Sequence, residues 1–168
     1  YGDWSSDVCS SDLLSIGVAS ADFNGDGIAD LAVADRNNSD VSILTGDGQG
    51  NFTIETTVYT GSCPMGVTKS DYNGDGRFDL AVYNDCSDTL TILTNEGALN
   101  FSSQDVGLYA RPPRNIISAD LNSDGYDDII LESDNQVHIV MNWGSSDPDN
   151  HPAGTFKSDD ARTVDGAN

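Results

Sequence analysis

Short stretches in which apolar and polar residues alternate recur along most of the chain and predict β-strands. In the first part of the chain these stretches cover residues 16–20, 31–33, 41–44 and 53–59. Alternation with a period of two is typical of strands that bury one face. No segment carries apolar residues at a sustained 3.6-residue period, so we expect almost no helix.

The strand pattern occurs three times, with corresponding positions about 49 residues apart. The third strand of the set recurs at residues 90–93 and 137–140. A turn that ends in an aromatic residue follows each time, at Phe52, Phe101 and Phe156. Four short strands in each repeat are typical of a β-propeller blade rather than of a sandwich. We therefore expect an all-β propeller with blades at residues 14–62, 63–111 and 112–160, and a truncated fourth blade from about residue 161.

A nine-residue acidic loop separates the first two strands of each repeat. Its first Asp lies at positions 22, 71 and 120, which are 49 residues apart both times. Loop positions 1, 3, 5 and 9 carry side-chain oxygens and position 6 is Gly, whereas position 7 varies, as expected if only its carbonyl is used. Calcium takes six to eight oxygen ligands in irregular geometry. The expected calcium ligands are Asp22, Asn24, Asp26, Ile28 and Asp30; Asp71, Asn73, Asp75, Arg77 and Asp79; and Asp120, Asn122, Asp124, Tyr126 and Asp128.

The loops could instead be turns without an ion, or calcium loops of a helical type. A single Asp/Asn/Gly turn often forms without an ion, but three copies in register favour a metal. An EF-hand loop needs a bidentate Glu at position 12 and helices on both sides, and a dockerin-type loop also needs an acid there. Position 12 is Val33, Val82 or Leu131, so both of these loop types are excluded.

These motifs resemble a known repeat. The segments 21–33 and 41–52 are similar to FG-GAP repeats, also called VCBS-type repeats, and the resemblance covers roughly residues 14–156. It implies a seven- or eight-bladed, integrin-α-like propeller with calcium beneath each hairpin, and so about three calcium ions in this chain. It also implies an exported protein, extracellular or on the cell surface and of bacterial type. It does not imply one activity, because fold and function separate here.

The length predicts an incomplete ring. The first Asp of a loop follows the landmark Phe by 19 residues, which places a fourth loop near position 175, beyond residue 168. A ring takes four to eight blades, so the remaining blades of the same polypeptide are expected partners. Residues 1–13 contain a tandem Ser-Ser-Asp that resembles a translated sequencing-adapter remnant. We expect this segment to be non-native; an ordinary polar tail is the alternative.

The chain is strongly acidic. Its formal net charge is −21, from 25 Asp and 3 Glu against 7 Lys and Arg. This balance argues against nucleic acid as a partner, because binding a phosphate backbone requires clustered cations. No run of 18 apolar residues occurs, so no membrane span is expected.

Two cysteines of the second repeat are candidates for a disulfide. The hairpin is centred near Asp75, so residues whose numbers sum to about 150 face each other, and Cys63 and Cys86 sum to 149. They are expected to meet at the open end of the hairpin, within bonding reach. Two free thiols are the alternative. A metal site is less favoured, because no His lies near them in sequence.

Two further features are candidates for ligand contacts. Arg111 and Arg114 flank one interblade turn and suit either an acidic ligand or surface ion pairs. The segment 142–154 is eight residues longer than its counterparts and carries Trp143 and His151. It is either a ligand loop or a loop without a function of its own.

No catalytic set is visible, and no Gly-x-Ser-x-Gly motif occurs. The sequence therefore predicts a non-enzymatic structural, adhesive or ligand-binding module whose ligand is a protein or a glycan. An extracellular enzyme built on such a propeller, similar to a polysaccharide lyase or a phospholipase, is the alternative, and a lectin is a third possibility.

Overall fold

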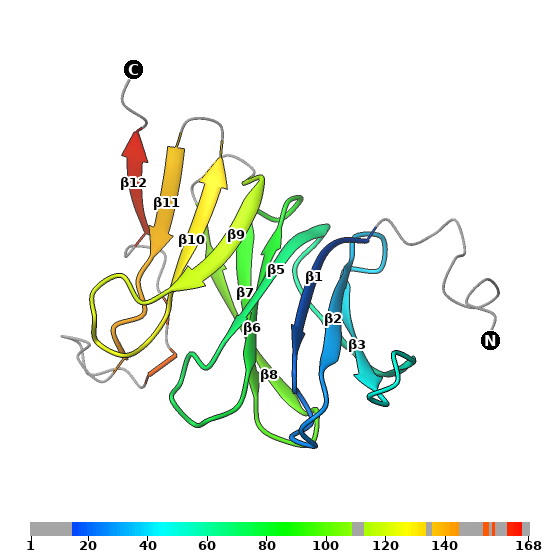
Figure 1. The fold of residues 1–168 in the computed structure, drawn as a ribbon. Helices are drawn as coiled ribbons and strands as arrows, with labels where there is room; N and C mark the ends of the chain where they lie inside the picture. The colour runs from blue at the N-terminus through cyan, green and yellow to red at the C-terminus, as the bar shows by residue number, and fades with distance from the viewer. Residues whose placement is uncertain are drawn as a thin grey trace.

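Figure 1 shows the computed structural model of the chain, which describes residues 15–108, 113–133, 136–144, 153–154, 156 and 161–165. These residues form three four-stranded antiparallel sheets and contain no α-helix. The all-β prediction is therefore confirmed. Residues 1–13, expected to be non-native, lie outside the described residues.

Each sheet is built from four strands in a repeated hairpin pattern. The first sheet has the order β1-β2-β3-β4, the second β5-β6-β7-β8 and the third β12-β11-β10-β9. The strands are β1 (Ser15–Ala21), β2 (Asp30–Asp35), β3 (Asp40–Gly46), β4 (Phe52–Tyr59), β5 (Pro64–Ser70), β6 (Asp79–Asn84), β7 (Thr89–Asn95), β8 (Phe101–Gly107), β9 (Asn115–Ala119), β10 (Asp128–Ser133), β11 (Gln136–Val140) and β12 (Ala161–Asp165).

The third sheet reaches further along the chain than its repeat was expected to. Strand β12 pairs with β11, with Val140 opposite Ala161 and Gln136 opposite Asp165. The sheet therefore extends beyond residue 160, where the third repeat was expected to end. The eight additional residues before Phe156 account for part of this shift; in addition, β12 begins at Ala161, after its landmark Phe156, whereas β4 and β8 begin at Phe52 and Phe101.

Alternation along the second strand of each sheet sends neighbouring side chains to opposite faces. In β6, Leu80 and Val82 join the core cluster between the first and second sheets, whereas Ala81 and Tyr83 join the cluster between the second and third. All six residues of β6 are buried. The middle sheet therefore packs on both of its faces. Fully burying a side chain such as Leu80 or Val82 contributes about 1.5–3 kcal/mol.

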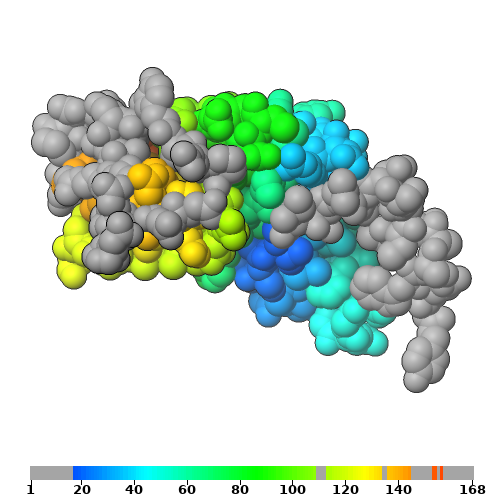
Figure 2. All heavy atoms as spheres, turned by 90° about the horizontal axis from the view of Figure 1, so that it is seen from above, coloured from blue at the N-terminus to red at the C-terminus, as the bar shows by residue number. Residues whose placement is uncertain are grey.

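The three sheets lie side by side in chain order (Figures 1 and 2). Strand β5 contacts both β1 and β9. Glycines permit this approach, because a Cβ on Gly17 would lie 2.8 Å from the Val67 nitrogen and one on Gly66 would lie 2.8 Å from Ile116. Among the described residues the row is open and no sheet closes on itself. Val18 on β1 and Ile117 on β9 remain 59% and 49% exposed.

Candidate metal loops

The three acidic loops connect the first and second strands of their sheets and lie at the same end of all three sheets, the lower end in Figure 1. Loop 1 is residues 22–30, loop 2 residues 71–79 and loop 3 residues 120–128. Each loop closes a hairpin between the first and second strands. In the strand pair next to the loop, the Asp at position 9 lies opposite the residue that precedes position 1; in loop 1 these are Asp30 and Ala21. The pairs Ser70–Asp79 and Ala119–Asp128 are equivalent.

The position-1 Asp organises the loop backbone. Asp22 Oδ1 accepts hydrogen bonds from the amides of Gly25 (2.7 Å) and Asp26 (3.1 Å), and its Oδ2 accepts one from Gly27 (2.8 Å). Asp71 and Asp120 accept the same three bonds in their loops. These bonds fold the chain around one carboxylate. Gly at position 6 suits the turn because its φ is positive, at 85° in Gly27.

The residues at positions 3 and 5 form a second shared pattern. Asn24 Oδ1 accepts from the Asp26 amide (2.9 Å), and Asn24 Nδ2 donates to Asp26 Oδ2 (2.8 Å). Loops 2 and 3 repeat both contacts. One oxygen of the position-5 carboxylate is therefore held by an amide donor in all three loops.

The position-9 Asp is fully buried in every loop. Asp79 Oδ2 accepts from the Tyr72 amide (3.0 Å), and its Oδ1 accepts from the Asn95 amide (2.8 Å) at the end of β7. Asp30 and Asp128 make the corresponding pair of bonds. The sequence predicted these residues as metal ligands only, but each also ties its loop to the third strand of its sheet.

Neighbouring carboxylates affect the protonation of these buried groups. The pKa of Asp79 is raised to about 6 in all: burial raises it most, the hydrogen bonds from Asn95 and Tyr72 lower it in part, and the Asp75 and Asp71 carboxylates add to the rise. Burial likewise raises the pKa of Asp128. Loops 2 and 3 therefore hold negative charges close enough to oppose the ionisation of the buried carboxyl at position 9.

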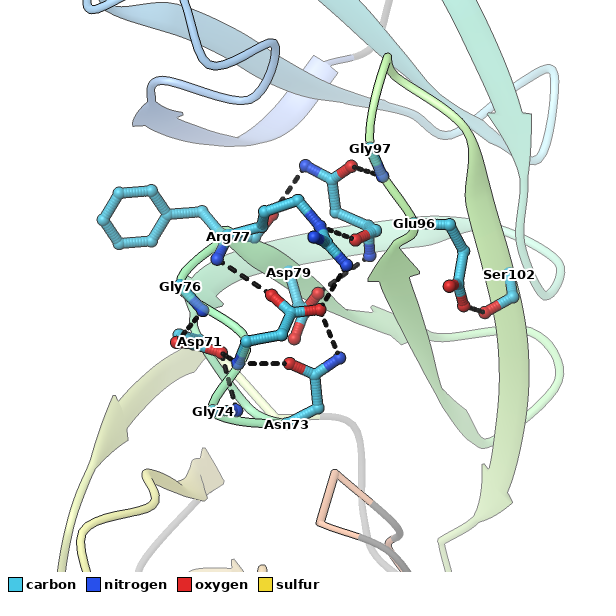
Figure 3. Close-up of polar contacts among 12 residues, drawn as sticks. Asp71, Asn73, Gly74, Gly76, Arg77, Asp79, Glu96, Gly97 and Ser102 are labelled. Carbon is cyan, nitrogen blue, oxygen red and sulfur yellow. Dashed lines mark hydrogen bonds and ion pairs between the residues drawn. The ribbon is translucent and has the colours of Figure 1, made fainter.

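Loop 2 differs from the other two because position 7 is charged. The guanidinium of Arg77, which is labelled in Figure 3, donates from Nη2 to Asp75 Oδ2 and forms an ion pair with it. Arg77 Nε also donates to the backbone oxygen of Asn95 (2.6 Å). Position 7 was expected to contribute only its backbone carbonyl, so this ion pair was not predicted.

Two buried asparagines link adjacent sheets, and neither was predicted from the sequence. Asn95 Nδ2 donates to the carbonyl of Phe23 in loop 1 (2.9 Å), and Asn142 Nδ2 donates to the carbonyl of Tyr72 in loop 2 (2.8 Å). Asn95 is the last residue of β7, Asn142 lies two residues after β11, and the two are 47 residues apart. Only the recurrence of Asn at equivalent positions of the second and third repeats could have identified these residues from the sequence. The equivalent position of the first repeat is Gly46.

The donor chemistry of each loop fits calcium. Carboxylate, amide and carbonyl oxygens are its ligands, and each loop supplies all three kinds. In all three loops the position-5 carboxylate accepts a hydrogen bond from the side-chain amide at position 3. In the described part of the chain, no three His, Cys, Asp or Glu side chains gather as a metal-holding group, so the fit rests on this mixed set of oxygens.

The second sheet contains a disulfide between Cys63 and Cys86, whose Cα atoms are 5.3 Å apart. It lies at the opposite end of the sheet from loop 2, across the open end of the hairpin. Nearby, Arg36 Nη2 donates to Asp85 Oδ2 (3.0 Å) and joins the first two sheets.

The other predicted ligand contacts are only partly described. Arg111, residues 145–150 and His151 lie outside the described residues. Arg114 is exposed, and its backbone amide donates to Glu132 (2.6 Å). The two ends of the 142–154 segment come together, because Gly144 and Gly154 both donate to Asn142 Oδ1. No helix among the described residues is long and apolar enough to cross a membrane.

Comparison with known families agrees with this repeat geometry. The FG-GAP-like repeat pattern matches residues 22–82 and 71–131. Each match begins at position 1 of one loop and ends three residues beyond the next loop. The chain belongs to the FG-GAP-like repeat family. No curated protein matches it. The three sheets are thus three successive FG-GAP-like units, each with its loop at the same end.

Proposed function

We propose that this FG-GAP-like chain is a calcium-stabilised β-propeller module of an exported protein, with a non-enzymatic structural, adhesive or ligand-binding role. The observation that carries the proposal is the repetition of one oxygen-rich loop geometry in three sheets. In each loop, the carboxylates at positions 1 and 5 accept N–H bonds within the exposed loop, and a buried carboxylate at position 9 ties the loop to its sheet. A divalent cation offsets the repulsion among these groups, so binding favours the closed hairpin.

The remaining features support the rest of the proposal. A disulfide is typical of proteins exported to an oxidising compartment. Extracellular modules bind calcium at about 10⁻⁴ to 10⁻³ M. At millimolar calcium, mass action then gives about 0.4–1.4 kcal/mol for each site. Three sites contribute on the order of 1–4 kcal/mol, a sizeable share of the stability of an ordinary domain.

Thermal unfolding with and without calcium tests the proposal. Chelator is expected to lower the melting temperature, and calcium to restore it better than magnesium, which demands octahedral geometry. Asp26→Ala should remove the part of the calcium-dependent rise in melting temperature that comes from one site. Asp47→Ala is the matched control: Asp47 also accepts backbone amide bonds, from Gln49 and Asn51, but in an exposed turn outside the loops. A melting temperature indifferent to chelator would exclude the calcium proposal.

A further inference from the structure

The three loops differ in the side chain that accompanies the position-5 carboxylate. Asp26 is followed at position 7 by Ile28, and Asp124 by Tyr126, neither of which carries a charge. Asp75 is followed by Arg77, whose guanidinium is bonded to it. The Asp75 carboxylate therefore has a cation of its own, built into the chain.

One carboxylate oxygen of Asp75, Oδ2, is shared between two donors. Asp75 Oδ2 accepts from Asn73 Nδ2 (2.8 Å) and also from Arg77 Nη2. The corresponding oxygens in loops 1 and 3 accept only the neutral amide donor among the described contacts. An ion that binds loop 2 through Asp75 must displace or share a positively charged donor, whereas in the other loops it replaces a neutral one.

Arg77 is held near the carboxylate but is free enough to be displaced. Its Nε donates to the Asn95 carbonyl, which anchors the base of the guanidinium, and its side chain is 42% exposed. It also lines a hollow of about 150 Å³ together with Asp22 and Asn24 of loop 1. The guanidinium thus has space beside the neighbouring acidic loop once it leaves Asp75.

We propose that Arg77 is a tethered counter-cation that holds loop 2 closed without metal and makes it the weakest of the three calcium sites. This inference rests on the proposed calcium function. The repulsion between one single and one double positive charge a few ångströms apart in a hydrated site is worth about 1.4 kcal/mol, or roughly tenfold in affinity. The three sites therefore fill in two steps as calcium rises, with loop 2 last.

Equilibrium dialysis against radioactive calcium tests this on the full chain. The unmodified chain should bind two ions with similar affinity and a third about tenfold more weakly. Asp75→Ala should remove the weak step and Asp26→Ala one tight step. Arg77→Gln should raise the affinity of the third, weak site for calcium about tenfold, so that all three sites fill in one step. Arg77→Lys retains the positive charge, so the binding curve should still show two steps.

Two variants control for the loss of a positive charge. Arg36→Gln removes a cation paired with Asp85 at the other end of the sheets. Lys69→Gln removes one near loop 2 whose Nζ lies 4.2 Å from the centre of the Phe78 ring rather than on a carboxylate. Both should leave the two binding steps unchanged.

Melting measurements give a second readout, one that a purely structural role of Arg77 would not produce. In chelator, Arg77→Gln should melt below the unmodified chain, because Asp75 loses its counter-cation. In saturating calcium the difference should vanish or reverse. If loops 1 and 3 bind calcium and Arg77→Gln behaves like Arg36→Gln, the role of Arg77 is refuted. If no variant binds calcium, the calcium proposal itself fails, and this inference fails with it.

Discussion

Replacing Asn95 with Ala is the sharpest test of how adjacent FG-GAP-like units are joined. Asn95 is fully buried. Its Nδ2 donates to the carbonyls of Phe23 (2.9 Å) and Phe78 (3.3 Å), and its Oδ1 accepts from the Gly97 amide (3.0 Å). Only the first bond crosses to the neighbouring unit. Truncation removes all three bonds and leaves the Phe23 carbonyl in a buried setting without this donor.

The cost follows from which partners remain buried. Leaving one buried polar group unpaired costs about 1–3 kcal/mol, and an ordinary hydrogen bond contributes about 0.5–1.5 kcal/mol. Phe23 is 2% exposed, so its carbonyl bears the larger penalty, whereas Phe78 and Gly97 are half-buried and can be hydrated. We therefore expect Asn95→Ala to lower the free energy of unfolding by about 2–3 kcal/mol.

Urea unfolding followed by circular dichroism measures this difference. With a slope near 2 kcal/mol per molar urea, the midpoint should fall by about 1–1.5 M. Asn51→Ala is the matched control: Asn51 Nδ2 donates to Asp47 Oδ2 in an exposed turn within one unit, so its loss should cost less than about 0.5 kcal/mol. Equal midpoints for the two variants would refute the assignment of Asn95 as a link between units.

Three further predictions concern other parts of the molecule. Cys63 and Cys86 are 23 positions apart, so the bridge should contribute about 3 kcal/mol by the entropic estimate; linked peptides in a non-reduced digest are expected, and two alkylatable thiols would contradict it. The pKa of Asp79, raised to about 6, means that the folded state binds the proton more tightly than the unfolded chain. In buffer freed of calcium beforehand, stability should thus fall by about 1–2 kcal/mol as pH rises from about 4 to 6, less than the full shift implies because the exposed loop around Asp79 can relax; urea midpoints that do not fall across this range would be inconsistent with it, and Asp79→Asn should remove the step. The chain expressed by itself should associate through its exposed outer faces, near Val18 and Ile117; light scattering that shows a clean monomer would argue against this.

The strands and hairpins could be predicted because they depend on local pattern. A period of two within each strand and a 49-residue spacing between the acidic loops were sufficient to locate them. The last strand of the third sheet was less predictable. Its position depends on how far the long connection after β11 travels, and composition does not determine that path.

The contacts between units could not be read from the sequence. Asn95 ends a strand and Asn142 follows one, both strands have ordinary patterns, and the partners of the two asparagines lie 72 and 70 residues earlier in the chain. The structural bonds of the buried position-9 carboxylates were not predicted for a related reason. An Asp within an acidic loop suggests a ligand, and its bond to the end of the third strand exists only after the sheet has formed. Arg77 was treated as a variable position because no other repeat has a charge there.

The opposite facing of neighbouring residues in β6 has a consequence for how such chains change over evolutionary time. Leu80 and Val82 meet the preceding unit, while Ala81 and Tyr83 meet the following one. Each unit therefore carries one half of two different contacts, and the halves are encoded by separate residues. Duplication of a whole unit places two matching halves together without any compensating substitution. Insertion of part of a unit would bring together faces that do not match. Gain or loss of whole repeats therefore preserves the packing between neighbouring units.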